Sequence, residues 1–170
     1  MDIRADRIGY AAFETPGQLL DYGTSRFDSG DTGFARVGFL FRALAPSVLV
    51  LRSPRTRSTR RRPRWTLNLR LIEAESKKLG IQVMFVAERT LKGHFAAFEC
   101  RNKFQIAELL GRWFPELARR VPRPRKCYEP EPWAMACFDA IALGAAYFMV
   151  MSDDVPSMRR DDGMLSPASK

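Results

Sequence analysis

Histidine and cysteine are scarce in this sequence. The 170 residues contain one histidine, His94, and three cysteines, Cys100, Cys127 and Cys137, without a Cys-x-x-Cys spacing. A disulfide framework needs paired cysteines, and a structural zinc site needs closely spaced Cys or His ligands, so the sequence favours neither. A serine or cysteine nucleophile would have a single available base, and nothing else supports such a triad. An odd number of unpaired cysteines is typical of a reducing compartment, and we predict a cytoplasmic protein.

Long apolar segments are also few, and only residues 133–151, WAMACFDAIALGAAYFMVM, approach the length of a membrane span. Asp139 lies inside this run, and small residues recur along it, which favours close packing against protein over contact with lipid. The start of the chain places Asp2, Arg4 and Asp6 where a signal peptide would be basic and then apolar. We therefore predict a buried helix and no membrane association.

The charge is strongly one-sided. Lys and Arg number 28 against 19 Asp and Glu, for a formal net charge of +9. Such a balance favours an anionic partner, with nucleic acid ahead of a membrane surface. The length and the 46% hydrophobic content predict one domain over residues 1–151, and the polar residues 152–170 are expected to form a disordered tail.

Hydrophobic periodicity predicts an α/β fold with a mixed sheet flanked by helices. Residues 7–14 and 18–27 are predicted to form a hairpin around Thr15-Pro16-Gly17. The later elements are expected in this order: a helix over 34–44, a strand over 47–51 covered on both faces, a helix over 67–79, a strand over 81–86, a helix over 103–113, a connector over 122–132 and the final helix; residues 88–101 are ambiguous.

Residues 52–64, RSPRTRSTRRRPR, contain seven arginines and no apolar side chain, so this segment is predicted to be a mobile loop. Phosphate contact is favoured over a merely solvated charge run. The predicted nucleic-acid contacts are Arg52, Arg55, Arg57, Arg60, Arg61, Arg62 and Arg64, together with Arg125 and Lys126 of the connector, for which a solvated turn is the alternative. Trp65 is a candidate for base stacking or for the first core residue of the next helix.

Three short stretches resemble RuvC-type Holliday junction resolvases and the related YqgF proteins. DIRADRIGYAAF, from Asp2, is similar to the family's first strand, with an Asp and a Gly at the same offset. FDAIALGAAYF, around Asp139, is similar to its last helix, and Asn102-Lys103 resembles the start of a helix in its catalytic region. The resemblance spans roughly residues 2–150 and implies an RNase H-like, RuvC-like fold.

The resemblance also implies a function. RNase H-like nucleases hold two magnesium ions, or manganese, between carboxylates from separate elements and hydrolyse a phosphodiester. By resemblance Asp2 and Asp139 would be ligands, Glu131 is a candidate third ligand, and Lys103 would lie near the scissile phosphate. The expected activity is a metal-dependent endonuclease on structured or branched DNA, with DNA ahead of RNA and a homodimer as a candidate assembly.

The sequence departs from the family pattern in three places. The fourth-strand Glu is replaced by Arg52, an acidic position one turn before the final Asp is Ala136, and the Gly after the first-strand Asp is Arg4. A guanidinium can pair with Asp2 or a phosphate but cannot ligate magnesium. Three alternatives therefore stay open: an ion pair in place of a metal at Asp139, an inactive nucleic-acid-binding module, and an adaptor for an acidic protein.

Overall fold

The computed structural model describes residues 1–27, 31–53, 63–126 and 128–151, without the side chains of residues 31–34 and 63–65. The elements follow in the order β1 (Asp2–Ile3), β2 (Arg7–Thr15), β3 (Gln18–Arg26), α1 (Asp31–Leu44), β4 (Val48–Arg52), α2 (Pro63–Lys78), β5 (Gln82–Val86), α3 (Glu88–Ala96), α4 (Lys103–Trp113), a 3-10 turn η2 (Pro115–Arg120) and α5 (Met135–Met151).

The strands form two hydrogen-bonded groups that meet at β1. Strands β1, β2 and β3 are antiparallel, with Asp2 opposite Gly9 and Ile3 opposite Ile8, whereas β4 and β5 are parallel. The amino group of Met1 donates a hydrogen bond of 2.7 Å to the Val50 carbonyl of β4. Strand β1 is therefore the edge of the first group that lies next to β4. The strand directions are mixed, as predicted.

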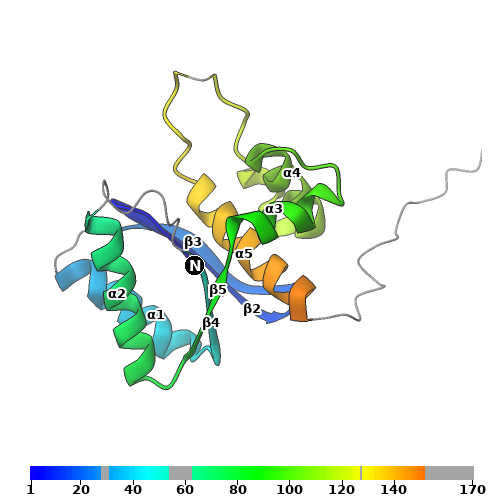
Figure 1. Ribbon diagram of the computed structural model, residues 1–170. Coiled ribbons are helices and arrows are strands. Elements are labelled where there is room, and N and C mark those ends of the chain that lie inside the picture. The colour runs from blue at the N-terminus through cyan, green and yellow to red at the C-terminus, as the bar shows by residue number, and fades with distance from the viewer. Residues whose placement is uncertain (28–30, 54–62, 127, 152–170) are drawn as a thin grey trace, which may run out of the picture.

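Helices cover both faces of these strands (Figure 1). Helices α1 and α2 lie on one face, where Leu49, Leu51 and Ile72 belong to one apolar cluster. Helix α5 lies on the other face with α3 and α4 outside it, and there Ile141 belongs to a second cluster, against which Val50 packs. The predicted strand over 47–51 is thus covered on both faces, because alternate side chains of a strand point in opposite directions.

Helix α5 is the central helix of the second cluster. Its residues from Met135 to Ala146 are buried except Asp139, which is partly exposed. The helix approaches the strands closely where its residues are small: a Cβ on Gly9 would overlap the Ala136 carbonyl, and a Cβ on Gly144 would overlap the Phe13 ring. Within the described residues, no helix is both long and apolar enough to cross a bilayer.

Most expected elements are confirmed, with differences at their ends. The ambiguous residues 88–101 contain α3, which ends at Ala96. The expected loop over 52–64 is wrong at both ends, because Arg52 closes β4 and α2 begins at Pro63. Proline suits the first turn of a helix, where its missing N–H has no partner to lose. The remainder of that loop, residues 54–62, and the expected tail, residues 152–170, lie outside the described residues.

The contact between β2 and α5 gives a test of the packing. Gly9→Ala is expected to lower the free energy of unfolding by at least about 2 kcal/mol, because overpacking against a rigid neighbour typically costs roughly 1–3 kcal/mol and the neighbour here is backbone. Urea unfolding measures the change. Gly93→Ala is the matched control, since its Cβ would meet nothing within 4 Å and alanine is favoured over glycine in a helix by about 1 kcal/mol. Equal losses in the two variants would contradict this account of the β2–α5 contact.

Candidate functional site

Three carboxylates, one from the start of the chain and two from residues 131–139, converge on one guanidinium. Arg4, just after β1, pairs with Asp2 Oδ2 at 2.8 Å through Nε and with Asp139 Oδ2 at 2.6 Å through one terminal nitrogen. Its other terminal nitrogen pairs with the carboxylate of Glu131, in the connector before α5. The structure thus brings together the three predicted ligands Asp2, Glu131 and Asp139, but it does so around an arginine.

Two further cations complete the cluster. Arg52, at the end of β4, has Nε 3.3 Å from Asp2 Oδ1 and a terminal nitrogen 3.8 Å from Asp139 Oδ2. The Nε–H makes no aligned hydrogen bond, so its contact with Asp2 is electrostatic. Lys103 pairs with the carboxylate of Glu131 through Nζ. These residues, Asp2, Arg4, Arg52, Lys103, Glu131 and Asp139, are called the ion-pair cluster below.

Local sequence explains why Lys103 reaches this place. Asn102 caps α4: its Oδ1 accepts hydrogen bonds from the backbone N–H groups of Phe104 at 3.0 Å and Gln105 at 3.1 Å. An asparagine at this position satisfies N–H groups that have no partner inside the helix. The cap fixes Lys103 as the first residue of α4, with its side chain 40% exposed. Asn102, the first residue of the Asn102-Lys103 pair, therefore has a structural role as the N-cap of α4.

The cluster is electrically balanced, with three carboxylates against three cations. Burial raises the pKa of the Asp139 carboxyl above its ordinary value and the nearby Asp2 adds to the rise, while the surrounding cations oppose it. Burial also lowers the pKa of Lys103, and the Asp139 carboxylate opposes that shift. Charges removed from water are stable only when paired, and here each partly buried carboxylate has a cationic partner within the chain.

This arrangement does not fit a divalent cation. A magnesium ion requires several oxygen ligands around one point, and the space between these carboxylates holds the Arg4 guanidinium. Within the described part of the chain, no group of three or more His, Cys, Asp or Glu side chains is arranged to hold a metal. Ala136, where the family pattern has another acid, is fully buried beside Gly9. At Asp139 the structure therefore contains an ion pair, which is one of the alternatives that the sequence left open.

Other residues singled out in the sequence lie away from the cluster. The connector is held by its own contacts: Arg125 donates to the backbone carbonyl of Glu129, and the Glu129 carboxylate accepts from the backbone N–H of Lys126 at 3.0 Å. The Lys126 ammonium lies 5.8 Å from the centre of the Tyr128 ring. Glu131, and not Glu129, is therefore the connector acid that reaches the cluster.

Several predicted residues belong to the part of the chain that the structure does not describe. Arg55, Arg57, Arg60, Arg61, Arg62 and Cys127 lie outside the described residues, as do the side chains of Arg64 and Trp65. Cys100 and Cys137 are buried, and burial raises the pKa of the Cys137 thiol to about 12, which suits a packing residue better than a nucleophile.

The central residue of the cluster, Arg4, is absent from the predicted site. Its signal in the sequence is the replacement of a small residue by arginine two positions after Asp2. An arginine so close to a predicted ligand adds a positive charge where a metal ion would have to bind. Arg52 lies 3.3 Å from Asp2, and this pairing is one of the two alternatives that the sequence left open for it.

The fold is similar to that of solved structures. RuvC of Thermus thermophilus in complex with a Holliday junction substrate matches with a TM-score of 0.61 and 16% identity, over 89% of this chain and 92% of that one. A second structure of the same protein matches with a TM-score of 0.62 and 16% identity, over 88% of this chain and 93% of that one. No family model and no curated protein matches the sequence. The chain therefore has the RuvC-like, RNase H-type fold that its first strand and last helix predicted.

Proposed function

We propose that this chain is a nucleic-acid-binding protein in which a RuvC-like fold has exchanged its metal site for an internal ion-pair cluster, so that it binds without cutting. The observation that carries the proposal is the contact of one guanidinium, that of Arg4, with all three candidate ligands. Arg52 takes the place of the fourth-strand carboxylate and brings a second guanidinium to the same cluster.

Charge and position support the binding role. The chain carries a formal charge of +9, and each cation placed near a phosphate adds to the counterion release that drives binding. The arginine-rich segment begins with Arg52, which lies in the ion-pair cluster. A phosphate backbone held by that segment would therefore run past the cluster. DNA is favoured over RNA because the similar RuvC structure contains a Holliday junction substrate.

A metal-dependent endonuclease is the second candidate. It is favoured by the meeting of Asp2, Glu131 and Asp139 from β1, the connector and α5, which is the set that the family resemblance implies. This activity would require Arg4 to leave the carboxylates when nucleic acid and metal arrive. The two candidates therefore differ in one outcome: only the endonuclease would cleave nucleic acid when metal ions are added.

Binding and cleavage assays separate the candidates. Labelled four-way junction, duplex and single-stranded DNA and RNA are incubated with the wild type and with Asp139→Asn, in magnesium, manganese or EDTA. We expect both proteins to bind the four-way junction in all three conditions and neither to cleave it. The affinity should fall by about tenfold or more between 50 and 200 mM salt, because phosphate contacts and not metal hold the complex. Metal-dependent cleavage that disappears in Asp139→Asn would instead establish the endonuclease.

A competitor identifies the adaptor alternative. If heparin or an acidic peptide displaces the protein from the four-way junction as readily as unlabelled junction does at equal charge, the basic surface has no preference for nucleic acid. We expect junction DNA to compete more strongly, since a nucleic-acid site recognises the spacing of phosphates as well as their charge.

Removal of Arg4 is expected to create affinity for divalent metal. In Arg4→Ala the three carboxylates lose their shared partner, and the positive charge they require can come from a bound ion. Bound manganese should raise the Tm of the variant by roughly 5 to 10 °C when its concentration is about one hundred times the Kd, and it should leave the Tm of the wild type unchanged. Thermal unfolding at increasing manganese concentrations measures both.

Arg7→Ala is the matched control for this experiment. Arg7 also lies at the start of the chain, but it is 3.7 Å from Asp6 and stacks 4.9 Å from the centre of the Trp133 ring, away from the three carboxylates. We expect no manganese response in this variant. An equal response of the wild type and Arg4→Ala would show that Arg4 does not stand in the way of a metal.

A further inference from the structure

Trp133 is an exposed tryptophan in the turn that leads into α5. It is 43% exposed, and it is a member of neither apolar cluster that the described residues form. Its indole ring lies instead against the guanidinium of Arg7, whose central carbon is 4.9 Å from the ring centre. The side chain of Arg7 is only 16% exposed. Because the ring is much more exposed than the guanidinium, its exposed face is the one turned away from Arg7.

The backbone of Trp133 is held from two sides. Its carbonyl accepts a hydrogen bond from the Thr24 hydroxyl of β3 at 3.5 Å and another from the Ala136 N–H at 3.4 Å. Pro132 precedes it, and a proline fixes its own φ. A large aromatic ring is thus presented to solvent from an anchored backbone. Anchoring of this kind lowers the entropy that is lost when a ligand binds.

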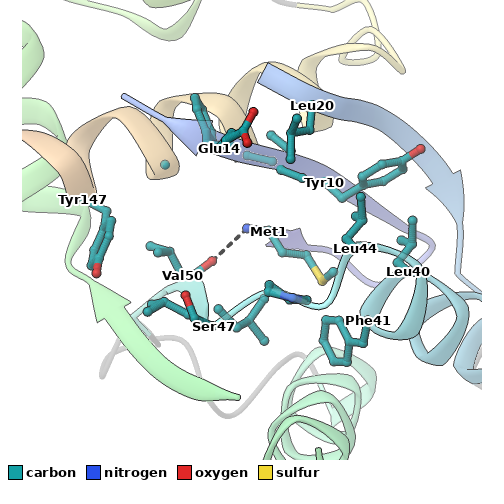
Figure 2. Close-up of a pocket in the computed structure, with 18 of the residues that line it drawn as sticks. Met1, Tyr10, Glu14, Leu20, Leu40, Phe41, Leu44, Ser47, Val50 and Tyr147 are labelled. Atoms are coloured by element: carbon teal, nitrogen blue, oxygen red, sulfur yellow. Dashed lines mark hydrogen bonds between the residues drawn. The ribbon is translucent and has the colours of Figure 1, made fainter. Parts of the chain in front are cut away.

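The strand register places Trp133 on the α5 face of the antiparallel strands. Tyr10 of β2 lies beside α1, in the wall of a cavity on the opposite face (Figure 2). Alternate residues of a strand point to opposite faces, so Arg7 and Gly9 face α5. Thr24 is opposite Gly9, and directly opposite residues share a face. The bond from Thr24 therefore holds Trp133 against this side of β3.

This position is the far end of a row of residues that begins in the ion-pair cluster. Asp2, Gly9 and Thr24 are opposite one another across β1, β2 and β3. Neighbouring strands are about 4.8 Å apart, so the row spans about 10 Å. The Ala136 carbonyl lies over Gly9 in the middle of the row. A nucleic-acid strand that passes the cluster would reach Trp133 within roughly three stacked nucleotides, at about 3.4 Å each.

A second guanidinium lies over an aromatic ring on the same face. Tyr22 is two residues before Thr24 on β3, so the two side chains point the same way. Arg120 of η2 is exposed and lies 5.3 Å from the centre of the Tyr22 ring. Tyr22 itself packs against the second apolar cluster. Arg120 is therefore the group that this pair presents to a ligand, and a guanidinium suits a phosphate.

From these contacts we propose that Trp133 is a stacking platform for an unpaired DNA base, with Arg120 on the same face for a neighbouring phosphate. The inference rests on the proposed nucleic-acid binding and names its substrate class, which is DNA with unpaired bases. Only an unpaired base can present a whole ring face to a side chain, because the bases of a duplex stack on one another. Every base has such a face, so the platform would accept any sequence.

Two oligomers separate stacking from phosphate contact. One is a short oligothymidylate, and the other is an abasic deoxyribose-phosphate chain of the same length. We expect Trp133→Ala to weaken binding of the oligothymidylate by about tenfold or more, as the removal of a stacking ring typically does. Binding of the abasic chain, and the salt dependence for both, should stay unchanged because the phosphate contacts remain. An equal effect on both oligomers, or no effect on either, would overturn the platform.

Phe39→Ala is the matched control for this substitution. Phe39 is 55% exposed and also has a guanidinium over its ring, that of Arg36 at 5.5 Å. It belongs to α1, on the opposite face of the strands (Figure 1). We expect its loss to leave the affinity for both oligomers unchanged. A loss of affinity for the oligothymidylate as large as that in Trp133→Ala would contradict the assignment to Trp133.

Trp133→Phe separates the loss of the ring from a loss of structure. Phenylalanine keeps an aromatic face, so this variant should retain most of the affinity for the oligothymidylate. In the wild type, the oligothymidylate should quench tryptophan fluorescence more than the abasic chain does. This additional quenching should disappear in Trp133→Phe while binding persists.

The inference and the proposed function can fail separately. If the additional quenching is the same in the wild type and Trp133→Phe, the platform is wrong and the nucleic-acid binding stands. If the wild type binds neither oligomer nor the four-way junction, the proposed function fails and the platform fails with it.

Discussion

The contact of the Arg4 guanidinium with Asp2, Glu131 and Asp139 is the constraint on which the centre of this molecule depends. It joins the end of β1 to the connector and α5, which follow more than 100 residues later in the sequence. A buried pair contributes little net stability relative to an apolar replacement, but removal of one partner leaves an uncompensated charge that is strongly destabilising. Each member of the cluster is therefore held in place by the others, and a single substitution in it is costly.

The position of Arg4 in the cluster follows from the short strand β1. Strand β1 contains only Asp2 and Ile3, so Arg4 follows at once and can turn toward α5, while the edges of β2 and β4 beyond Met1 face one another across a cavity. The RuvC-like fold tolerates this because the helices on its two faces build separate apolar clusters. The layers hold the strands in position although β2 and β4 do not pair with each other among the described residues.

Much of the fold could be predicted from local chemistry. Thr15-Pro16-Gly17 indicates a hairpin, Gly80 has a positive φ of 70° and ends α2, and Asn102 begins α4, since each of these effects depends on near neighbours. The meeting of Asp2 with Asp139 followed from the resemblance to a family. The role of Arg4 could not be predicted, because two of its three carboxylate partners, Glu131 and Asp139, are more than 100 residues away in the sequence and only its contact with Asp2 is local.

Helix α5 is apolar around its whole circumference, and burial alone sets no preference for one rotation about its axis over another. Asp139 removes this ambiguity. Its carboxylate lies 2.6 Å from the Arg4 side chain, and only one angular setting of the helix allows that contact while Ala136 faces Gly9. The ion pair of Asp139 and the close approach of Ala136 to Gly9 thus agree on one rotation of the helix about its axis.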